Sequence, residues 1–525
     1  MEILQIRNLS FSYPNINGFT RALTDVNINI NEGEFVVVCG ESGSGKSTLL
    51  KLLKPEISPA GKTEGEVWFA GEKLTSENSL SIGYMGQDYE LSIVTDRVYQ
   101  ELAFGPENLN LDSGSIRRRI SEISSYFGMD EWLNSPTDKL SGGQKQILSL
   151  ASVLTMRPRV ILLDEPMGSL DPVSADRLMG MLRRLNSELG ITVVMVEHAL
   201  EFCLSYASRL IVLKNGRVFY DGEPANAIGT VKNERIFEAF PAVAKLVDRF
   251  GIEGWDGQFT VLSAKKYLEG KPHRDVLRET SDEASGEEVL KAKDIYYAYE
   301  RKSPFIVRGA SISLNAGETL AVLGGNGSGK STFIKTLCGI NKPQRGRVSA
   351  QGSVAYLPQD TKLAFLKDSV RADYESYVEY MGLDSAVIAD ISRKLGIEEL
   401  LDRHPYDLSG GQRALAAMGK MFMSNAKIML FDEPTQGLDM GMKKVIADIF
   451  KRLKEEGRCI LFVTHDTVFA QMASDKAYMF FDGGITEPEK THRFFRENNY
   501  YTTPARLIAG DVDAVSVDEI IKAYS

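Results

Sequence analysis

The 525-residue sequence predicts two α/β domains in tandem, each built around a mostly parallel central sheet. The first observation is an internal repeat, because "GESGSGKST" at residues 40–48 returns as "GGNGSGKST" at residues 324–332. The second is a pair of short apolar runs, "GEFVVVCG" and "GETLAVLG", which end in glycine as buried strands do. The third is the helical periodicity of the segments that follow them, "KSTLLKLL" and "KSTFIKTL".

Further motifs recur in the same order in both copies. "LSGGQ" occurs twice, and apolar runs ending in Asp-Glu-Pro occur at residues 160–166 and 428–434. Apolar runs also precede His198 and His465, and all four runs read as buried strands flanked by helices. We therefore expect one domain over residues 1–230 and a second over residues 289–525.

The segment between the copies, residues 231–288, has a weaker pattern. "RIFEAFPAVAKLVDRFGI" predicts an amphipathic helix interrupted at Pro241. "ETSDEASGEE" is small and acidic, which is typical of a solvated linker. We expect a helical appendage followed by an acidic linker.

Composition limits the class of protein. A net charge of −10 and a pI near 5.3 argue against nucleic acid as the main partner, because phosphate binding needs a basic surface. The four cysteines are scattered without a CxxC pair, so neither a zinc site nor a disulfide framework is indicated. No signal peptide and no run of 18 apolar residues is present, which predicts a cytoplasmic chain held at a membrane only by a partner.

The two Gly-rich loops predict nucleotide binding, because both fit G-x-x-x-x-G-K-[ST] between a strand and a helix. Their backbone N–H groups and the helix N-terminus would surround the β-phosphate, and the lysine would reach the β- and γ-phosphates. The serine after each lysine would bind Mg²⁺. The residues expected around the phosphates are Gly40, Ser42, Gly43, Ser44, Gly45, Lys46, Ser47 and Thr48, and in the second copy Gly324, Asn326, Gly327, Ser328, Gly329, Lys330, Ser331 and Thr332.

Paired acids follow two of the predicted strands. Asp164 and Asp432 end their strands beside the phosphate loop, where a carboxylate suits Mg²⁺ coordination. Glu165 and Glu433 come next, and a carboxylate there can accept a hydrogen bond from the attacking water. An N-cap for the aspartates or an ion pair for the glutamates is the structural alternative.

Histidine and glutamine occupy matching positions in the two copies. His198 and His465 follow the glutamates at similar spacing, which favours a contact with the γ-phosphate over a purely structural histidine. Gln87 and Gln359, in "YMGQD" and "YLPQD", would contact Mg²⁺ or water. A neutral amide releases such a ligand easily, as a sensor should.

An aromatic residue precedes each phosphate loop. Tyr13 and Tyr299 end "LSFSY" and "IYYAY", and a ring there could stack on adenine. Tyr297 competes with Tyr299 for this role, and a core or edge-strand position is the alternative for each.

Taken together, these motifs resemble the nucleotide-binding domains of ABC ATPases. The resemblance implies P-loop ATPase domains, each with a mostly parallel central sheet, an antiparallel β subdomain and a helical signature subdomain. It also implies a head-to-tail pair in which each ATP lies between one copy's Gly-rich loop and the other copy's LSGGQ, so ATP and Mg²⁺ would bind at two hydrolytic sites. By this resemblance Ser141, Gly142, Gly143 and Gln144 serve the ATP held by Lys330, and Ser409, Gly410, Gly411 and Gln412 the ATP held by Lys46.

The stretch "TDRVYQELAFGPENL" at residues 95–109 bears on the class of ABC protein. It resembles the segment after the glutamine loop in the ATPases of energy-coupling factor (ECF) importers, as do "FPAVAKLVDRFGI" and "MVEHAL", which contains Glu197. It predicts a short helix opened by Thr95 and closed by Gly105-Pro106. An apolar patch of Val98, Tyr99 and Leu102 would then receive a helix from a transmembrane subunit, or would pack within the domain.

The ECF resemblance implies a motor on the cytoplasmic face of the membrane. Its partners would be a transmembrane scaffold and a substrate-binding membrane subunit that takes up a vitamin or metal ion. The second copy lacks AFGPEN, so its contact with such a partner is less defined.

Two other classes of tandem ABC chain fit the sequence less well. Soluble translation factors acting on ribosomes usually carry "NHLD" after the Asp-Glu pair and a basic linker, and the recycling type carries an iron–sulfur cluster. Here the text reads "GSLD" and "QGLD", the linker is acidic and the cysteines do not suit a cluster. Tandem sugar-importer ATPases often have one degraded half, and this chain does not.

Overall fold

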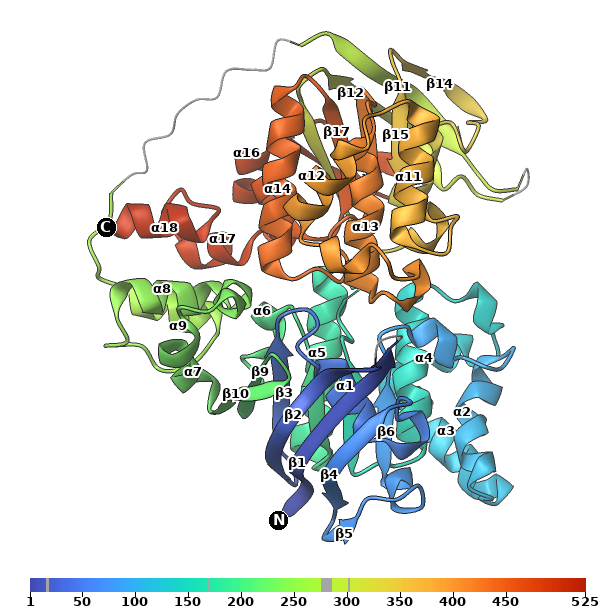
Figure 1. Cartoon of the computed structure of the whole chain (residues 1–525), viewed down its shortest axis with the longest axis vertical. Coiled ribbons are helices and arrows are strands. Elements are labelled where there is room, and N and C mark those ends of the chain that lie inside the picture. Colours follow the sequence, from blue (N-terminus) through green and yellow to red (C-terminus); the bar gives the residue numbers. More distant parts are fainter. Residues whose placement is uncertain (16–17, 169, 275–285, 301–302) are drawn as a thin grey trace. The chain divides into compact units, whose positions relative to one another are not determined.

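The computed structural model describes residues 1–15, 18–168, 170–274, 286–300 and 303–525 (Figure 1). Contacts divide the chain into two compact units. The first comprises residues 1–170, 174–244 and 257–259, and the second comprises residues 171–173, 245–256 and 260–525. The acidic stretch predicted as a linker lies, up to residue 285, outside the described residues.

The first unit contains a central sheet and an antiparallel sheet. In the central sheet, in the order β10-β9-β3-β8-β7-β6, all neighbours are parallel except β10 and β9. The antiparallel sheet has the order β2-β1-β4-β5. The strands are β1 (Glu2–Asn15), β2 (Gly18–Asn31), β3 (Phe35–Gly40), β4 (Lys62–Phe69), β5 (Glu72–Lys73), β6 (Ile82–Met85), β7 (Val160–Asp164), β8 (Thr192–Val196), β9 (Arg209–Lys214) and β10 (Arg217–Gly222).

Burial explains this arrangement. Strands β3, β7 and β8 are buried along their whole length and mostly apolar, as expected for parallel strands covered on both faces. One core joins the inner faces of both sheets to the phosphate-loop helix α1 (Lys46–Leu52), through residues such as Phe11, Val36 and Leu50. The predicted α/β class is therefore confirmed.

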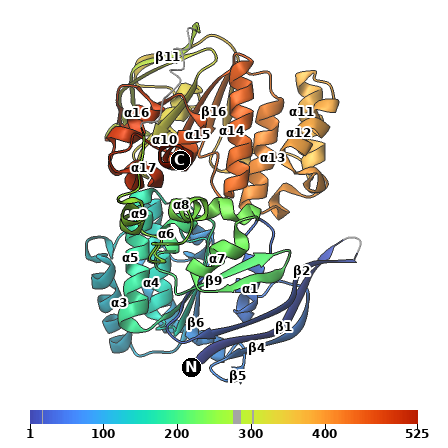
Figure 2. The same ribbon diagram turned by 90° about the vertical axis from the view of Figure 1, so that its left-hand side faces the viewer.

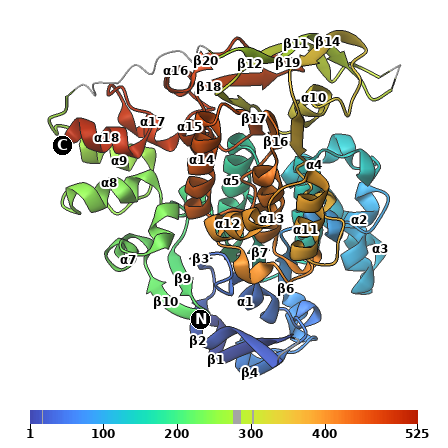
Figure 3. The ribbon, with the colours of Figure 1, turned by 45° about the horizontal axis from the view of Figure 1, so that its top comes forward.

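A helical group stands beside the central sheet. Figure 3 shows α2, α3 and α4 side by side, and these three helices contact one another. Helix α4 begins at the LSGGQ motif, so this group is the helical signature subdomain. Besides α1, the α-helices described in the first half of the chain are α2 (Val98–Asn108), α3 (Ser113–Phe127), α4 (Gly142–Thr155), α5 (Pro172–Leu189), α6 (Leu200–Cys203), α7 (Pro224–Val231), α8 (Ala242–Phe250) and α9 (Val261–Leu268).

The second unit repeats the plan. Its central sheet has the order β15-β16-β17-β13-β18-β19, with β20 paired to β18, and its antiparallel sheet has the order β12-β11-β14. The strands are β11 (Glu288–Tyr297), β12 (Val307–Asn315), β13 (Thr319–Leu323), β14 (Arg345–Ala350), β15 (Val354–Leu357), β16 (Ile428–Asp432), β17 (Cys459–Thr464), β18 (Lys476–Phe481), β19 (Gly484–Ile485) and β20 (Glu489–Lys490).

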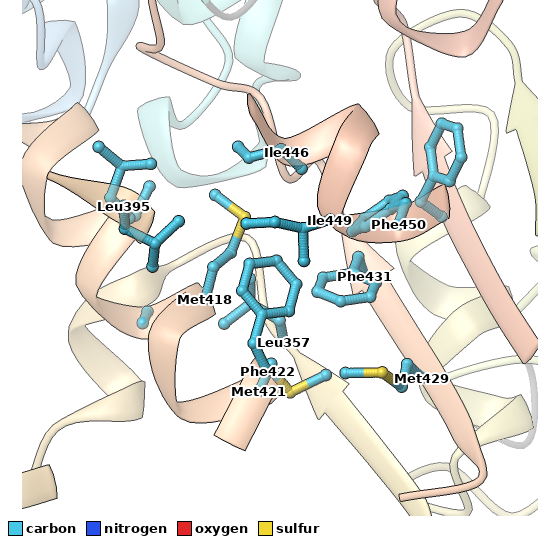
Figure 4. Close-up of a cluster of buried hydrophobic side chains, with 14 of the residues drawn as sticks. Leu357, Leu395, Met418, Met421, Phe422, Met429, Phe431, Ile446, Ile449 and Phe450 are labelled. Carbon is cyan, nitrogen blue, oxygen red and sulfur yellow. The ribbon is translucent and has the colours of Figure 1, made fainter. Parts of the chain in front are cut away.

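Aromatic packing dominates the larger core of the second unit. Figure 4 shows Phe422, Phe431 and Phe450 in one cluster with Met418 and Ile446, and each of these side chains is buried. The cluster connects the helix that carries Met418 and Phe422 to the central sheet, because Phe431 lies on β16. The helices are α10 (Lys330–Leu337), α11 (Val370–Met381), α12 (Ala386–Leu395), α13 (Gly410–Met423), α14 (Met440–Glu455), α15 (Thr467–Ala473), α16 (Thr491–Glu497), α17 (Pro504–Ala509) and α18 (Val517–Tyr524).

The appendage after the first copy packs against the C-terminal helices. Helix α9 contacts α17, the amide of Arg274 donates to the carbonyl of Ala523 over 2.9 Å, and the Tyr524 ring lies 6.4 Å from that of Phe250 (Figure 2). The predicted interruption at Pro241 is present, because a 3-10 helix (Arg235–Ala239) ends before it and α8 starts after it.

Helix α2 differs from its predicted bounds. It starts at Val98 without a side-chain cap and continues through Gly105-Pro106 to Asn108. Leu109 N–H donates to the Gly105 carbonyl over 3.1 Å, so the turn around the proline stays helical. Gly105 also leaves room for Met156, whose sulfur would lie 2.4 Å from an added Cβ. Packing therefore outweighs the local Gly-Pro stop signal.

The second copy places a helix at the same position. Val370 opens α11 just as Val98 opens α2, although the second copy carries no AFGPEN text.

Among the described residues, no helix combines the length and apolarity needed to cross a bilayer.

Candidate active sites

Each phosphate loop is shaped by glycine and held by its lysine. Gly45 has φ 99°, and a Cβ there would lie 2.7 Å from the Ala22 carbonyl oxygen, so the turn requires glycine. The Lys46 ammonium group donates to the carbonyls of Gly40 and Glu41, each over 2.9 Å. Its second-copy counterpart, Lys330, makes the same pair of bonds to residues 324 and 325, over 2.8 and 3.0 Å. Each lysine side chain therefore extends along its own phosphate loop.

Two buried hydroxyls in these loops have no hydrogen-bond partner among the described residues. They are Ser44 Oγ and Ser328 Oγ, at equivalent positions. Buried polar atoms are normally paired, so an unpaired donor in a loop that precedes a helix N-terminus fits an anionic ligand. These loops therefore suit the phosphates of ATP.

Oxygen ligands for a hard cation meet at the end of each phosphate loop. Ser47 Oγ donates to Asp164 Oδ1 over 2.9 Å, and Ser331 Oγ donates to Asp432 Oδ1 over 3.0 Å. Burial raises the pKa of Asp432 to about 6, although the bond from Ser331 acts in the opposite direction. Hydroxyl and carboxylate oxygens side by side are the donor set that Mg²⁺ prefers, so the residues present fit this ion.

A tyrosine holds the other oxygen of each aspartate. Tyr84 lies 3.4 Å from Asp164 Oδ2 and Tyr356 lies 3.3 Å from Asp432 Oδ2. Sequence reasoning missed both tyrosines, although each stands three residues before the predicted glutamine in "YMGQD" and "YLPQD". The repeated spacing was the signal that could have identified them.

The two glutamates after the aspartates have strained backbones. Glu165 has φ 51° and Glu433 has φ 52°, in the left-handed region that non-glycine residues rarely occupy. Such strain persists where the surrounding structure enforces it, and it is frequent at active sites. Here it turns both carboxylates toward the histidines.

Each glutamate is paired with the predicted histidine. His198 Nε2 lies 3.0 Å from Glu165 Oε1, and His465 Nδ1 lies 3.0 Å from Glu433 Oε2. Burial pushes the pKa of both glutamates up, but the histidine contacts and the nearby phosphate-loop lysine outweigh it, so each pKa is lowered. Both carboxylates are therefore ionised at neutral pH and suited to accept a proton or a hydrogen bond from water.

The predicted glutamines lie differently in the two copies. Gln87 Nε2 donates to Glu165 Oε2 over 2.8 Å, so the structure brings the glutamine loop to the first glutamate. Gln359 is exposed, and within the described part of the chain it makes no hydrogen bond to Glu433. The sequence predicted equivalent roles for both glutamines.

Tyr13 and Tyr299 occupy equivalent places beside the phosphate-loop helices. The Tyr13 hydroxyl lies 3.0 Å from Thr48 Oγ1, and the Tyr299 hydroxyl lies 3.1 Å from Thr332 Oγ1. Tyr299, rather than Tyr297, thus matches Tyr13. Stacking of these rings on adenine stays a prediction.

Both LSGGQ motifs form helix N-termini. Ser141 and Ser409 act as N-caps, and each is linked to its glutamine, Gln144 or Gln412, in a reciprocal capping box. The glutamine amides are therefore used inside their own motifs, and the glycines start the helices. Helix N-termini of this kind attract anions, and the contact of these motifs with ATP stays a prediction.

Comparison with known proteins agrees with this geometry. The sequence profile of the ABC transporter family matches residues 23–168 and 307–436. A protein of Bacillus thuringiensis subsp. konkukian, whose name describes an ABC transporter ATP-binding protein, is 37% identical over 95% of this chain and 94% of its own length. A similarly named protein of Methanosarcina acetivorans is 28% identical over 100% of this chain and 91% of its own length.

Solved structures support the fold. An archaeal ribosome recycling factor, aABCE1, superposes with a TM-score of 0.61, covering 93% of this chain and 92% of its own, at 20% identity. At that identity the likeness shows the shared fold alone.

Two phosphate loops, each with an acidic pair at the end of a strand of the same central sheet, define a tandem ATP-binding protein. The chain belongs to the ABC transporter family, and its two domains are ATPase domains.

Proposed function

We propose that this chain is the ATP-hydrolysing motor of an ECF-type importer. It couples ATP and Mg²⁺ turnover at two composite sites to uptake of a vitamin or metal ion through separate membrane subunits. The observation that carries the importer proposal is exposed apolar surface directly after both glutamine loops.

The first patch consists of Leu91, Val94 and Phe104, whose side chains are 76%, 61% and 49% exposed. Glu101 connects the loop that carries Val94 to helix α2, because Glu101 Oε2 accepts a hydrogen bond of 3.0 Å from the Val94 amide. Phe104 follows Glu101 by three residues on the same helix, and its side chain is exposed whereas that of Glu101 is buried. Exposed apolar residues gathered in this way are typical of an interaction site.

The second patch consists of Leu363 and Leu366, which are 72% and 87% exposed. They follow Gln359 at the same spacing as Leu91 and Val94 follow Gln87. Asp373 on α11 accepts a hydrogen bond of 2.9 Å from the Leu366 amide, as Glu101 does from Val94. Both copies thus present an apolar face that suits the amphipathic helix of a membrane subunit.

The predicted patch on α2 was partly wrong. Val98 and Leu102 are fully buried and pack within the helical group, so they are not available to a partner. Phe104, two residues beyond Leu102, is an apolar residue of α2 that is exposed. In the first copy, the proposed docking role therefore rests on the first patch, Leu91, Val94 and Phe104.

The test is purification of the tagged full-length chain from membranes with its co-purifying subunits. We expect Leu91→Ser/Phe104→Ser to lose those subunits and to retain the ATPase activity of the isolated chain. Leu189→Ser is the matched control, because Leu189 is 63% exposed in the same unit but lies at the end of α5. Recovery of the wild-type chain with ribosomes instead of membrane proteins would favour a translation factor and contradict the proposal.

A further inference from the structure

The two copies differ in how the catalytic glutamate is held. At the second site, Glu433 Oε2 accepts hydrogen bonds from Thr464 Oγ1 over 3.1 Å and from the His465 amide over 3.3 Å, besides its contact with the His465 ring. All these donors belong to the end of β17 and the residue after it. The second glutamate is therefore positioned by its own domain core.

At the first site, Glu197 replaces Thr464 and changes this arrangement. The Glu197 side chain is buried, only 2% exposed, and its Oε2 accepts the His198 amide over 3.1 Å. Its Oε1 accepts the Met167 amide over 2.8 Å. Glu197 thus takes the backbone donor that the second copy gives to its catalytic glutamate, and among the described residues it makes no hydrogen bond to Glu165.

Glu197 also serves as a clamp that the second copy builds from other residues. There Asp466, in the loop after β17, accepts from Thr435 Oγ1 in the loop after β16 over 3.3 Å and pairs with Lys443 Nζ on α14 at 2.6 Å. In the first copy, Glu197 links the corresponding loops by accepting the amides of Met167 and His198. Both oxygens of Glu197 therefore accept backbone amides, and Glu197 does not hold Glu165 in the way that Thr464 holds Glu433.

One of the two partners of Glu165 is a hydrogen-bond donor from a different loop. Its Oε1 contacts His198, and its Oε2 accepts from Gln87 Nε2 over 2.8 Å. Gln87 lies in the exposed loop that leads to Leu91 and Val94 of the first patch. Any partner that moves this loop moves a hydrogen-bond donor of the first catalytic glutamate.

We infer that Glu197 is a positioning residue that makes hydrolysis at the first site depend on the hydrogen bond from Gln87 to Glu165. Hydrolysis at the second site does not depend on a hydrogen bond from Gln359 to Glu433. The inference rests on the roles of Glu165 and Glu433 in the proposed function. It gives the two chemically similar sites unequal sensitivity to a partner at the glutamine loop.

The experiment compares Gln87→Ala with Gln359→Ala in the full-length chain, with the other site silenced by Glu433→Gln or Glu165→Gln. ATPase kcat and KM are measured at saturating Mg²⁺, so that any shared role of the glutamines in metal binding is matched. A hydrogen bond to a charged group accounts for about a 10-fold effect or more. We expect Gln87→Ala to lower kcat at least about 10-fold more than Gln359→Ala does, with similar KM values.

Exchange of the paired residues tests Glu197 itself. Glu197→Thr restores a hydroxyl and frees the His198 amide, so adding it to Gln87→Ala should recover kcat to within about 3-fold of the chain with Gln87 intact. Thr464→Glu should lower kcat at the second site, because it removes the hydroxyl donor to Glu433 and competes for the His465 amide. Glu197→Gln, which keeps the size of the side chain and one acceptor oxygen but adds no hydroxyl, should leave the dependence on Gln87 in place.

Equal losses from the two glutamine variants would overturn the inference. So would a folded Glu197→Thr variant, shown by an unchanged thermal transition, that gives no recovery. Failure of the importer proposal would appear instead as absent membrane partners with the difference between glutamines intact. Failure of the glutamate assignments would appear as ATPase activity in the Glu165→Gln/Glu433→Gln double variant.

Discussion

The hydroxyl of Ser47 donates a hydrogen bond of 2.9 Å to Oδ1 of Asp164, although 117 positions separate the two residues in sequence. The pair forms because parallel strands β3 and β7, both neighbours of β8, end at the same edge of the sheet. Ser331 and Asp432 repeat it in the second unit over 3.0 Å. Each pair presents two oxygens where a nucleotide-bound cation would sit.

Loss of the serine hydroxyl should therefore weaken the use of Mg²⁺. We expect Ser47→Ala to raise the Mg²⁺ concentration for half-maximal ATPase activity by at least about 10-fold when Glu433→Gln silences the second site. Titration of activity against Mg²⁺ measures this. Ser76→Ala, at an exposed serine of the same unit, is the control and should leave the curve unchanged.

Both glutamates should contribute to turnover. Because Glu165 and Glu433 are each ionised, strained and paired with histidine, we expect Glu165→Gln and Glu433→Gln each to remove part of the ATPase activity. The double variant should fall by about 100-fold or more, the usual effect of losing a general base. Steady-state ATPase measurement decides this. Full activity in one single variant together with none in the other would contradict two hydrolytic sites.

The parts of the fold predicted from sequence are those with local signals. Apolar runs ending in glycine, such as that before Gly40, and the periodic segments after the lysines appear as β3, β13, α1 and α10. The phosphate-loop, acidic and histidine motifs carry their chemistry in adjacent residues. Their meeting at one sheet edge follows from parallel strand order, which the repeat of strand and helix already implied.

The parts missed depend on contacts across the chain. The link between Tyr84 and Asp164 spans 80 positions, and the repeated spacing of the tyrosine before the glutamine marks the tyrosine but not its partner. Helix α2 was predicted to stop at Gly105-Pro106, but packing of Gly105 against Met156 favours its continuation. The role of Glu197 was hidden because its partners are backbone amides, which every sequence contains.

The aromatic cluster of the second unit predicts a large loss of stability on truncation. The Phe450 ring lies 4.9 Å from that of Phe431 and 5.8 Å from that of Phe462, and the side chain is 1% exposed. Phe450→Ala should lower the free energy of unfolding by about 3–5 kcal/mol through lost contacts and an unfilled cavity. Thermal or urea unfolding measures it. Phe481→Ala, at a side chain 75% exposed, should change the free energy by less than about 0.5 kcal/mol.

Glu197 predicts an unusual dependence of stability on pH. Burial raises its pKa from 4.5 to about 8, the amide of Met167 offsets part of this rise, and the charge of Glu165 adds to it. Between these two values the folded state retains a proton that the unfolded state has released. Stability contributed at this residue therefore falls as the pH rises, by at most about 1.4 kcal/mol per pH unit.

Glu197→Gln should remove that dependence, because the amide imitates the protonated carboxyl at every pH. We expect the difference in Tm between Glu197→Gln and the wild type to move in favour of the variant as the pH is raised from 5 to 8. Calorimetry at a series of pH values provides the measurement, and Glu107→Gln, at an exposed glutamate, is the matched control. A difference that stays constant over this range would show that Glu197 is ionised in the folded protein throughout.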